Sequence, residues 1–206
     1  MSLESVLTRI QALDTAFAPP QSTPAATSST TSGSSFADAL QGAMGTTATA
    51  ASAPVSTVTG NTVGARMVAA AAAEVGQAEQ PPGSNNSPRI AMYRSATAGN
   101  PGPGPWCAYF VSWAARQAGA PLGDQGQGFG SVDALYAWAQ RSGRAYTPAS
   151  GQTPQPGDLI VFHEHIGIVE SVDSNGQIHT IEGNSGDQVA RRVHQPSDAV
   201  GFVRVG

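Results

Sequence analysis

Three residues of this 206-residue chain, Cys107, His165 and Glu182, have side chains that could together perform acyl transfer, and Asn184 follows two positions after the last of them. Cys107 is the only cysteine, so it cannot form a disulfide within the chain. A thiolate can attack a carbonyl carbon, an imidazole can carry the proton, and a carboxylate can orient the imidazole. These residue types predict a cysteine-dependent hydrolase, provided that the fold brings them together.

The position of Cys107 favours a nucleophile over an inert thiol in the core. Free cysteines are commonly buried and unreactive, and a lone cysteine by itself favours that interpretation. Cys107, however, follows a loop rich in glycine and proline and lies at the start of the helix expected over residues 106–118. The first helical turn offers unpaired N–H groups and the positive end of the dipole, which stabilise a thiolate and an oxyanion. We therefore predict that Cys107 is the nucleophile.

A hairpin argument places the base and the acid on one face. Residues 173–176, Asp-Ser-Asn-Gly, form a turn signal between two strand-like segments. A four-residue loop there puts Gly167 opposite Glu182 and His165 opposite Asn184. A two-residue loop shifts the register, but the three polar side chains still share a face. Glu182 is then diagonal to His165, and Gly167 has no side chain to block the path between them.

His163 is the alternative base, because it shares a face with His165. We prefer His165, since it opens a regular strand pattern, whereas His163 lies in a tight connection. The remaining candidates are expected at the surface: Glu164, His179 and His194.

No metal or cofactor is expected. A site made of Cys107, His163 and His165 has a spacing that matches no common zinc pattern. Calcium prefers several oxygen ligands, and residues 80–123 contain no aspartate or glutamate.

The periodicity predicts an α+β fold, with helices first and an antiparallel meander after them. Helices are expected over residues 65–75, 89–94 and 106–118, and in a segment that Ser131 caps. Strands are expected over residues 158–162, 165–172, 177–182, 189–194 and 201–205.

The N-terminal third has a different composition. Residues 1–18 predict a short amphipathic helix, which either frays in solution or docks on a partner. Residues 19–62 are mostly Ala, Ser, Thr, Pro and Gly, which predicts a disordered linker, interrupted by a small apolar island at residues 36–40. Residues 63–206 are the predicted globular domain.

Charge and hydropathy argue against two classes of partner. The net charge is −4 and 12% of the residues are charged, so no basic stripe indicates nucleic acid. We expect no membrane span, because the longest apolar run, residues 67–73, is too short. The first residues lack the pattern of a secretory signal peptide, so we expect any export to use another route.

Residues 63–206 resemble a CHAP domain, the cysteine- and histidine-dependent amidohydrolase/peptidase family with a papain-like fold. The resemblance covers most of the predicted domain, and its motifs occur in the family's order: Trp106-Cys107-Ala108-Tyr109-Phe110-Val111-Ser112-Trp113, Pro156-Gly157-Asp158-Leu159-Ile160, His165-Ile166-Gly167-Ile168-Val169 and Ile181-Glu182-Gly183-Asn184. By position, the resemblance implies Cys107 as nucleophile, His165 as base, Glu182 as its orienter and Asn184 as an accessory polar residue.

This resemblance implies hydrolysis of an amide bond in peptidoglycan, in a stem peptide or a cross-bridge. A non-catalytic wall-binding or assembly module is the alternative, and a cytoplasmic amidase acting on a small amide is a third possibility. Trp106, Tyr109 and Phe129 are candidates for aromatic residues that line the substrate groove, although each could equally serve ordinary packing.

The N-terminal part also resembles peptidoglycan hydrolases encoded with actinobacterial flagellar genes, which begin with a short helix and a low-complexity linker. That resemblance implies export through the flagellar apparatus, contact with an export or rod component, and a role in wall remodelling during flagellum assembly. The expected place of action is the cell wall, after synthesis in the cytoplasm.

Overall fold

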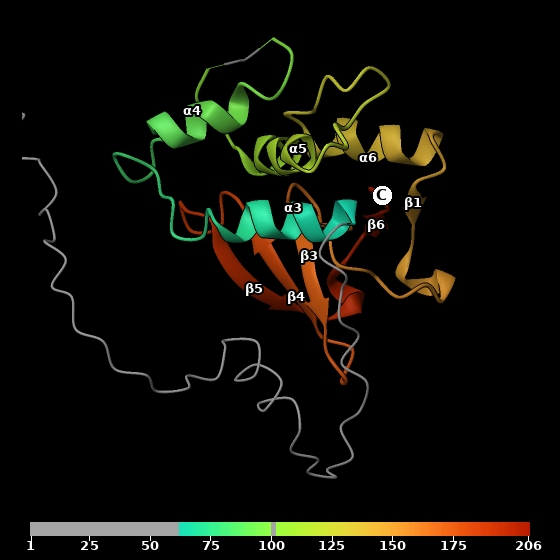
Figure 1. Ribbon diagram of the computed structural model, residues 1–206. Helices are drawn as coiled ribbons and strands as arrows, with labels where there is room; N and C mark the ends of the chain where they lie inside the picture. Colours follow the sequence, from blue (N-terminus) through green and yellow to red (C-terminus); the bar gives the residue numbers. More distant parts are fainter. Residues whose placement is uncertain (1–61, 100–101) are drawn as a thin grey trace, which may run out of the picture. The chain divides into compact units, whose positions relative to one another are not determined.

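The computed structural model describes residues 62–99 and 102–206 (Figure 1). The predicted helix over residues 1–18, almost all of the predicted linker and the apolar island lie outside the described residues. The described part has the predicted α+β architecture. Its helices are α3 (Val63–Ala72), α4 (Pro88–Arg94), α5 (Cys107–Gln117) and α6 (Val132–Arg141). Its strands are β1 (Ala145–Tyr146), β2 (Leu159–Val161), β3 (Ile166–Val172), β4 (Ile178–Glu182), β5 (Ala190–His194) and β6 (Gly201–Val203).

Three of the four described helices begin at a hydroxyl side chain that caps a backbone N–H. Thr62 accepts from Ala65 at 3.1 Å, and Ser87 caps α4 in the same way. Ser131 accepts from the N–H of Ala134 at 3.3 Å, which confirms the predicted cap of α6. The start of α5 differs, since Trp106 occupies the cap position and makes no side-chain cap hydrogen bond.

The strands form one antiparallel sheet in the order β1-β6-β2-β3-β4-β5. Strands β2 to β5 make the predicted meander, and β6 returns to pair with β2. Strand β1 was not predicted, because two residues are too short to show an alternating pattern. It adds to the free side of β6.

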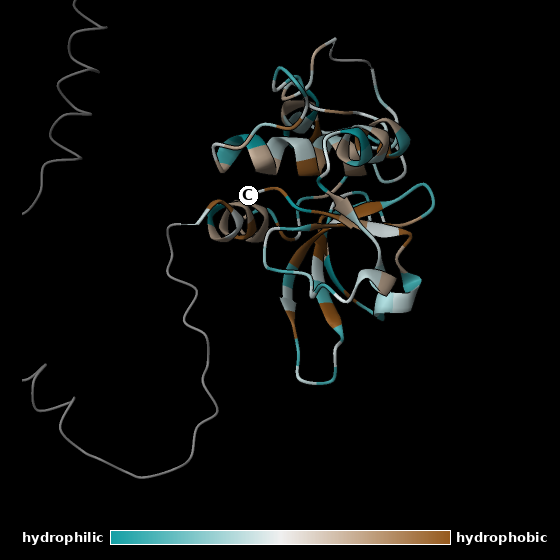
Figure 2. Cartoon of the chain, turned by 90° about the vertical axis from the view of Figure 1, so that its right-hand side faces the viewer, coloured by the Kyte–Doolittle hydropathy of each residue, from teal (hydrophilic) through white to brown (hydrophobic). Residues whose placement is uncertain are grey.

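Helix α5 lies at the centre of the group of helices, and both α5 and α3 contact β3 and β4 (Figure 1). Every residue from Cys107 to Ala115 is buried, and α5 contacts α3, α4 and β3. Figure 2 shows the helices stacked against the sheet, with apolar residues in both layers. Because a helix buried on all sides cannot shift without losing core contacts, its first residue is held firmly relative to the sheet.

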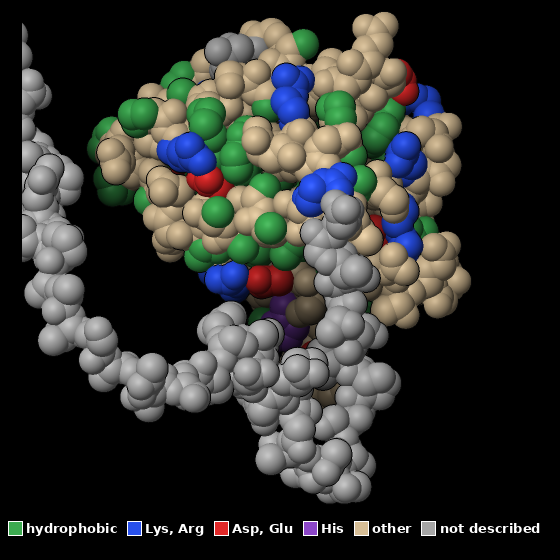
Figure 3. All heavy atoms as spheres, in the orientation of Figure 1, with side chains coloured by type: hydrophobic (Ala, Val, Ile, Leu, Met, Phe, Trp, Pro, Cys, Tyr) green, Lys and Arg blue, Asp and Glu red, His purple; other side chains and the backbone are tan. Residues whose placement is uncertain are grey.

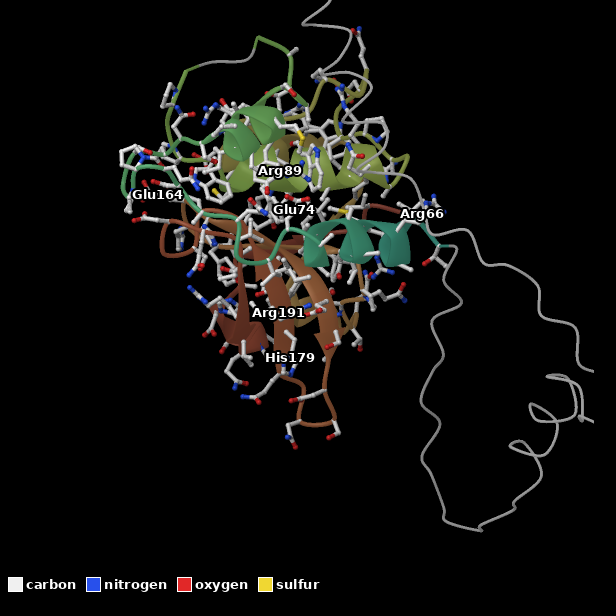
Figure 4. All side chains as sticks on the ribbon, turned by 60° about the vertical axis from the view of Figure 1, so that its left-hand side comes forward. Arg66, Glu74, Arg89, Glu164, His179 and Arg191 are labelled. Atoms are coloured by element: carbon white, nitrogen blue, oxygen red, sulfur yellow. The ribbon has the colours of Figure 1, made fainter. Side chains whose placement is uncertain are left out.

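An ion pair between the buried carboxylate of Glu74 and the exposed side chain of Arg89 ties the end of α3 to α4. Glu74 follows α3, and in Figure 4 it points toward Arg89 of α4. The Nε of Arg89 donates to Glu74 at 2.6 Å, and the hydroxyl of Tyr93 donates to the same carboxylate at 2.6 Å. Tyr93 in turn packs against Trp113 of α5 at a centroid distance of 5.1 Å, so this network positions α4 on α5.

The arginine side chains on the face shown in Figure 3 lie apart from one another and form no continuous stripe there. Within residues 62–99 and 102–206, no helix combines the length and the hydropathy that crossing a membrane requires.

Candidate active site

The β3–β4 hairpin has the predicted register at the end away from its turn, where His165 and Glu182 lie. Ile168 pairs with Ile181 and Val169 pairs with Thr180. Continued by one residue, this register places Gly167 opposite Glu182, as the turn argument predicted.

The other end of the hairpin differs from the prediction. The loop has five residues, 173–177, because Val172 pairs with Ile178 and the register shifts between Val169 and Ser171. The N–H of Asp173 donates to the carbonyl of Gln177 at 3.0 Å, and Gly176 has φ +79°. A loop with a left-handed glycine before its last residue is a common hairpin solution. The bulge in β3 absorbs the extra residue, so the error at the turn does not reach the site.

Gly167 makes room for the side chain of Glu182. A Cβ at position 167 would lie 2.7 Å from Cγ of Glu182 and 3.3 Å from its Cδ. Real carbon atoms do not approach so closely, so the Glu182 side chain crosses β3 only because residue 167 is glycine. This confirms the open path that the sequence predicted between Glu182 and His165.

The carboxylate of Glu182 is buried, and both of its oxygens have hydrogen-bond partners. Its Oε2 lies 2.9 Å from Nε2 of His165, while its Oε1 lies 2.5 Å from Oγ1 of Thr180 and 2.6 Å from Nε2 of His194. Burial raises the pKa of Glu182, but the hydrogen bonds from His165, Thr180 and His194 outweigh it and lower that pKa to about 2. Glu182 is therefore a carboxylate at neutral pH.

An ionised carboxylate only accepts hydrogen bonds, so Nε2 of His165 must carry its proton. That leaves Nδ1 of the ring for a second neighbour, and Cys107 lies close enough to the ring to raise its pKa. Burial lowers the pKa of His165, but its interactions with Cys107 and Glu182 raise it to about 9. Cys107 is only 4% exposed, whereas the His165 side chain is 27% exposed. Solvent therefore reaches the site at the imidazole of His165 more than at the thiol of Cys107.

Residues 99–184 match the family model described as CHAP domain. The chain is similar to CHAP domains over these residues, which make up less than half of its length. CHAP domains are generally hydrolytic amidases or peptidases that act on the cell wall. The matched segment contains Cys107, His165, Glu182 and Asn184. No curated protein and no solved structure matches the chain.

Asn184 lies in a turn after β4, beyond the last residue pair of β3 and β4. Strand β3 begins at Ile166 and β4 ends at Glu182, so the pairing of His165 with Asn184 that the hairpin predicted is not formed. Asn184 has φ +59° and is partly exposed. Asparagine tolerates this left-handed conformation better than most residues, which explains its presence in the turn.

Of the three predicted substrate-lining aromatics, Trp106 belongs to the core instead. It is fully buried, its Nε1 donates to the buried carboxylate of Glu79 at 2.9 Å, and its ring stacks on Tyr93 at 5.8 Å. An indole without exposed surface cannot line a groove, so this assignment is corrected. Trp106 is buried because α5, which begins at the next residue, is enclosed on every side.

The other two aromatics are not fully enclosed. Tyr109 is 8% exposed and packs tightly on the backbone at Gly130, where a Cβ would lie 2.2 Å from the tyrosine hydroxyl. Phe129 is half-buried and contacts Trp138 at a centroid distance of 5.5 Å. The substrate-lining role of Tyr109 and Phe129 stays a prediction.

The remaining polar candidates fall into two groups. His163 and Glu164 are exposed in the connection before β3, and Glu164 lies at the periphery of the fold (Figure 4). His179 is 39% exposed on the sheet and lies 3.5 Å from Asp173. These three placements agree with the sequence argument, which preferred His165 as the base. Among the described residues, no group of three or more His, Cys, Asp and Glu side chains is arranged to hold a metal ion.

His194 is the functional candidate that the sequence argument missed. It was expected at the surface, but its side chain is only 22% exposed and its Nε2 contacts Glu182. Strand alternation did carry a signal. Ile178 pairs with His194 and Thr180 pairs with Arg192, so His194 shares a face with Thr180 and Glu182 and lies diagonal to Thr180. The pairing of β4 with β5 was not predicted residue by residue, and so the contact was not foreseen.

Proposed function

We propose that the chain hydrolyses an amide bond of peptidoglycan by a Cys-His-Glu mechanism that passes through a thioester. The observation that carries this proposal is the 2.9 Å contact between the His165 ring and the buried carboxylate of Glu182, with Cys107 close enough to the same ring to raise its pKa. A nucleophile, a base and an orienting acid in that order are the arrangement that acyl transfer needs.

In the first half of the reaction, the Cys107 sulfur attacks the carbonyl carbon of the amide. A carbon–sulfur bond forms, the carbon–nitrogen bond breaks, and His165 gives the leaving amine a proton from Nδ1. Because its pKa is about 9, His165 holds that proton at neutral pH. In the second half, water attacks the thioester and gives a proton to Nδ1 of His165, and the carbon–sulfur bond breaks. The carboxylic acid leaves, and the free Cys107 sulfur and the protonated imidazole are restored.

Glu182 acts on the imidazole and not on the substrate. Its Oε2 keeps the proton on Nε2 and so directs Nδ1 toward Cys107. A buried carboxylate also stabilises the imidazolium that forms during the reaction. Its low pKa keeps it ionised throughout the neutral range.

The start of α5 suits the negative charge that develops on the substrate oxygen. Trp106 makes no side-chain cap hydrogen bond, so no capping side chain engages the N–H groups of the first turn. Backbone N–H groups and the helix dipole are suitable donors to an oxyanion formed beside the sulfur of Cys107.

The substrate class follows from the CHAP match, and the place of action follows from the substrate. Peptidoglycan lies outside the cytoplasmic membrane, so the proposal includes an extracytoplasmic site of action. Export by the flagellar apparatus, and a role during flagellum assembly, are part of the same proposal. They depend on the N-terminal residues, which lie outside the described part of the chain.

The test is digestion of purified peptidoglycan by the full chain and by three variants, with mass spectrometry of the released muropeptides. We expect cleavage by the native protein, and a loss of at least about 10³-fold in Cys107→Ala and His165→Ala. Glu182→Gln keeps the shape but places an amide against Nε2, so its loss is expected to be smaller. The mass of each product identifies the amide bond that is cut.

Two results would contradict the proposal. Equal cleavage by the native protein and Cys107→Ala would show that the thiol is not the nucleophile. Equal binding of both proteins to the wall, without cleavage by either, would favour a non-catalytic wall-binding module.

A further inference from the structure

Glu182 is held by two histidines, one on each carboxylate oxygen. His165 lies 2.9 Å from Oε2, and His194, from the edge of the sheet on β5, lies 2.6 Å from Oε1. The function proposed above uses only the first of these contacts. His194 also lies outside residues 99–184, the segment that matches the CHAP family model.

The contact with His194 has a defined direction. The Glu182 side chain is 3% exposed and ionised, so it can only accept, and Nε2 of His194 must be the donor. Hydrogen bonds to a buried charged group are among the stronger ones in proteins. His194 therefore restrains Oε1 of Glu182 together with Thr180.

Phe162 packs on both histidines. Its ring is 4.6 Å from the ring of His194 and 6.1 Å from the ring of His165, and it is nearly parallel to the latter. Phe162 is half-buried, so it shields one side of both imidazoles without closing the site. The two histidines thus share one carboxylate and one aromatic neighbour.

A carboxylate held only by His165 could rotate about its last bond, since terminal carboxylate torsions are broad. Donors on Oε1 remove that freedom and fix where Oε2 points. The orientation of the His165 ring, and with it the approach of Nδ1 to Cys107, depends on that direction.

We propose that His194 is a positioning residue of the active site, whose Nε2–H holds Oε1 of Glu182 so that Oε2 stays directed at His165. The inference rests on the proposed hydrolase function, but its geometric part concerns the free protein alone. His194 acts through Glu182 and does not touch the substrate.

The test compares His194→Gln with His194→Asn in the full chain. A glutamine amide reaches the position of Nε2 and can donate to Oε1, whereas an asparagine amide stops near the position of Nδ1. Both variants are polar and smaller than or similar to histidine, so both are compatible with the fold. His179→Gln is the matched control, because His179 is on the neighbouring strand and contacts Asp173 instead of Glu182.

Two measurements are made on each protein. Steady-state hydrolysis of a defined muropeptide gives kcat and KM, and NMR titration of the His165 ring gives its pKa without any substrate. We expect His194→Asn to lower kcat roughly tenfold with little change in KM. We also expect the pKa of His165 to fall from about 9 toward the ordinary value of 6.5. His194→Gln and His179→Gln are expected to keep the native values.

The inference is overturned if His194→Asn leaves kcat and the His165 titration as they are in the native protein. It is also overturned if the Gln and Asn variants lose activity equally, because then the ring and not its donor matters. Failure of the hydrolase function gives a different result. The native protein would then cleave no better than Cys107→Ala, while the titration of His165 would still decide the role of His194.

Discussion

Substituting Gly167 by alanine adds one methyl group at the point where Glu182 crosses β3. The three heavy atoms nearest to the new Cβ all belong to Glu182, with Cγ at 2.7 Å, Cδ at 3.3 Å and Oε1 at 3.4 Å. Ordinary contact begins at 3.4 Å, so Cγ must move by about 0.7 Å. The carboxylate cannot follow freely, because His165, Thr180 and His194 hold it at 2.9, 2.5 and 2.6 Å.

Two opposing effects set the size of the stability change. Inserting a methylene into a packed site costs about 1–3 kcal/mol. Alanine is favoured over glycine inside a strand by about 0.5–1 kcal/mol, because glycine loses more backbone entropy on folding. We therefore expect Gly167→Ala to lower the free energy of unfolding by about 1–2 kcal/mol. Activity should fall further, by about 10²-fold, because a displacement approaching 1 Å in a catalytic group has an effect of that order.

A double-mutant cycle separates this clash from a general effect on the strand. In a Glu182→Ala background Cγ is absent, so the alanine at position 167 should cost nothing or stabilise slightly. Urea unfolding of the four proteins should give a coupling of about 2 kcal/mol between the two positions. Two results would refute the reasoning that the Glu182 side chain needs glycine at position 167. One is an equal loss in free energy of unfolding from Gly167→Ala in both backgrounds, and the other is full activity in Gly167→Ala.

Two further predictions concern pH and the core. The pKa of His165 is raised from 6.5 to about 9, so its stabilising contribution is complete below pH 6.5 and is lost as the pH rises through 9. The pKa of Glu182 is lowered from 4.5 to about 2, so its contribution is complete above pH 4.5 and is lost as the pH falls through 2. Urea midpoints should therefore be highest between about pH 4.5 and 6.5. In Glu182→Gln the midpoint should fall less steeply on both the acid and the alkaline side. An unchanged pH dependence in this variant would contradict the assignment. Trp106→Phe removes the donor to the buried carboxylate of Glu79 and should lower the free energy of unfolding by about 1–3 kcal/mol without changing KM, whereas a raised KM at native stability would return Trp106 to the substrate groove.

The chemistry of the site and the local geometry of the β3–β4 hairpin could be predicted from the sequence. Cys107 at the start of a helix, Gly167 opposite Glu182, and Glu182 diagonal to His165 all follow from short-range rules. Strand alternation and turn chemistry act between residues that are neighbours along the chain or across one turn. The turn itself was misjudged by one residue, and the bulge near Glu170 kept that error away from the site.

The fate of the aromatic side chains could not be predicted in the same way. Trp106 looked like a groove residue beside the nucleophile, but its burial depends on Glu79 and Tyr93, which are 27 and 13 positions away. The sequence shows that an aromatic side chain will be largely buried, and it does not show whether the surface that buries it is the core or a ligand.

By itself, the sequence determined the proposed nucleophile, base and acid, because these roles are set by residue type, and their spacing on one helix start and one hairpin obeys local backbone geometry. Only the tertiary structure decided what surrounds them. The second hydrogen bond on Glu182 comes from His194, twelve residues further along the chain, through the pairing of β5 with β4. Such a contact depends on how separate elements pack and on which rotamers that packing permits, and those are properties of the whole folded domain.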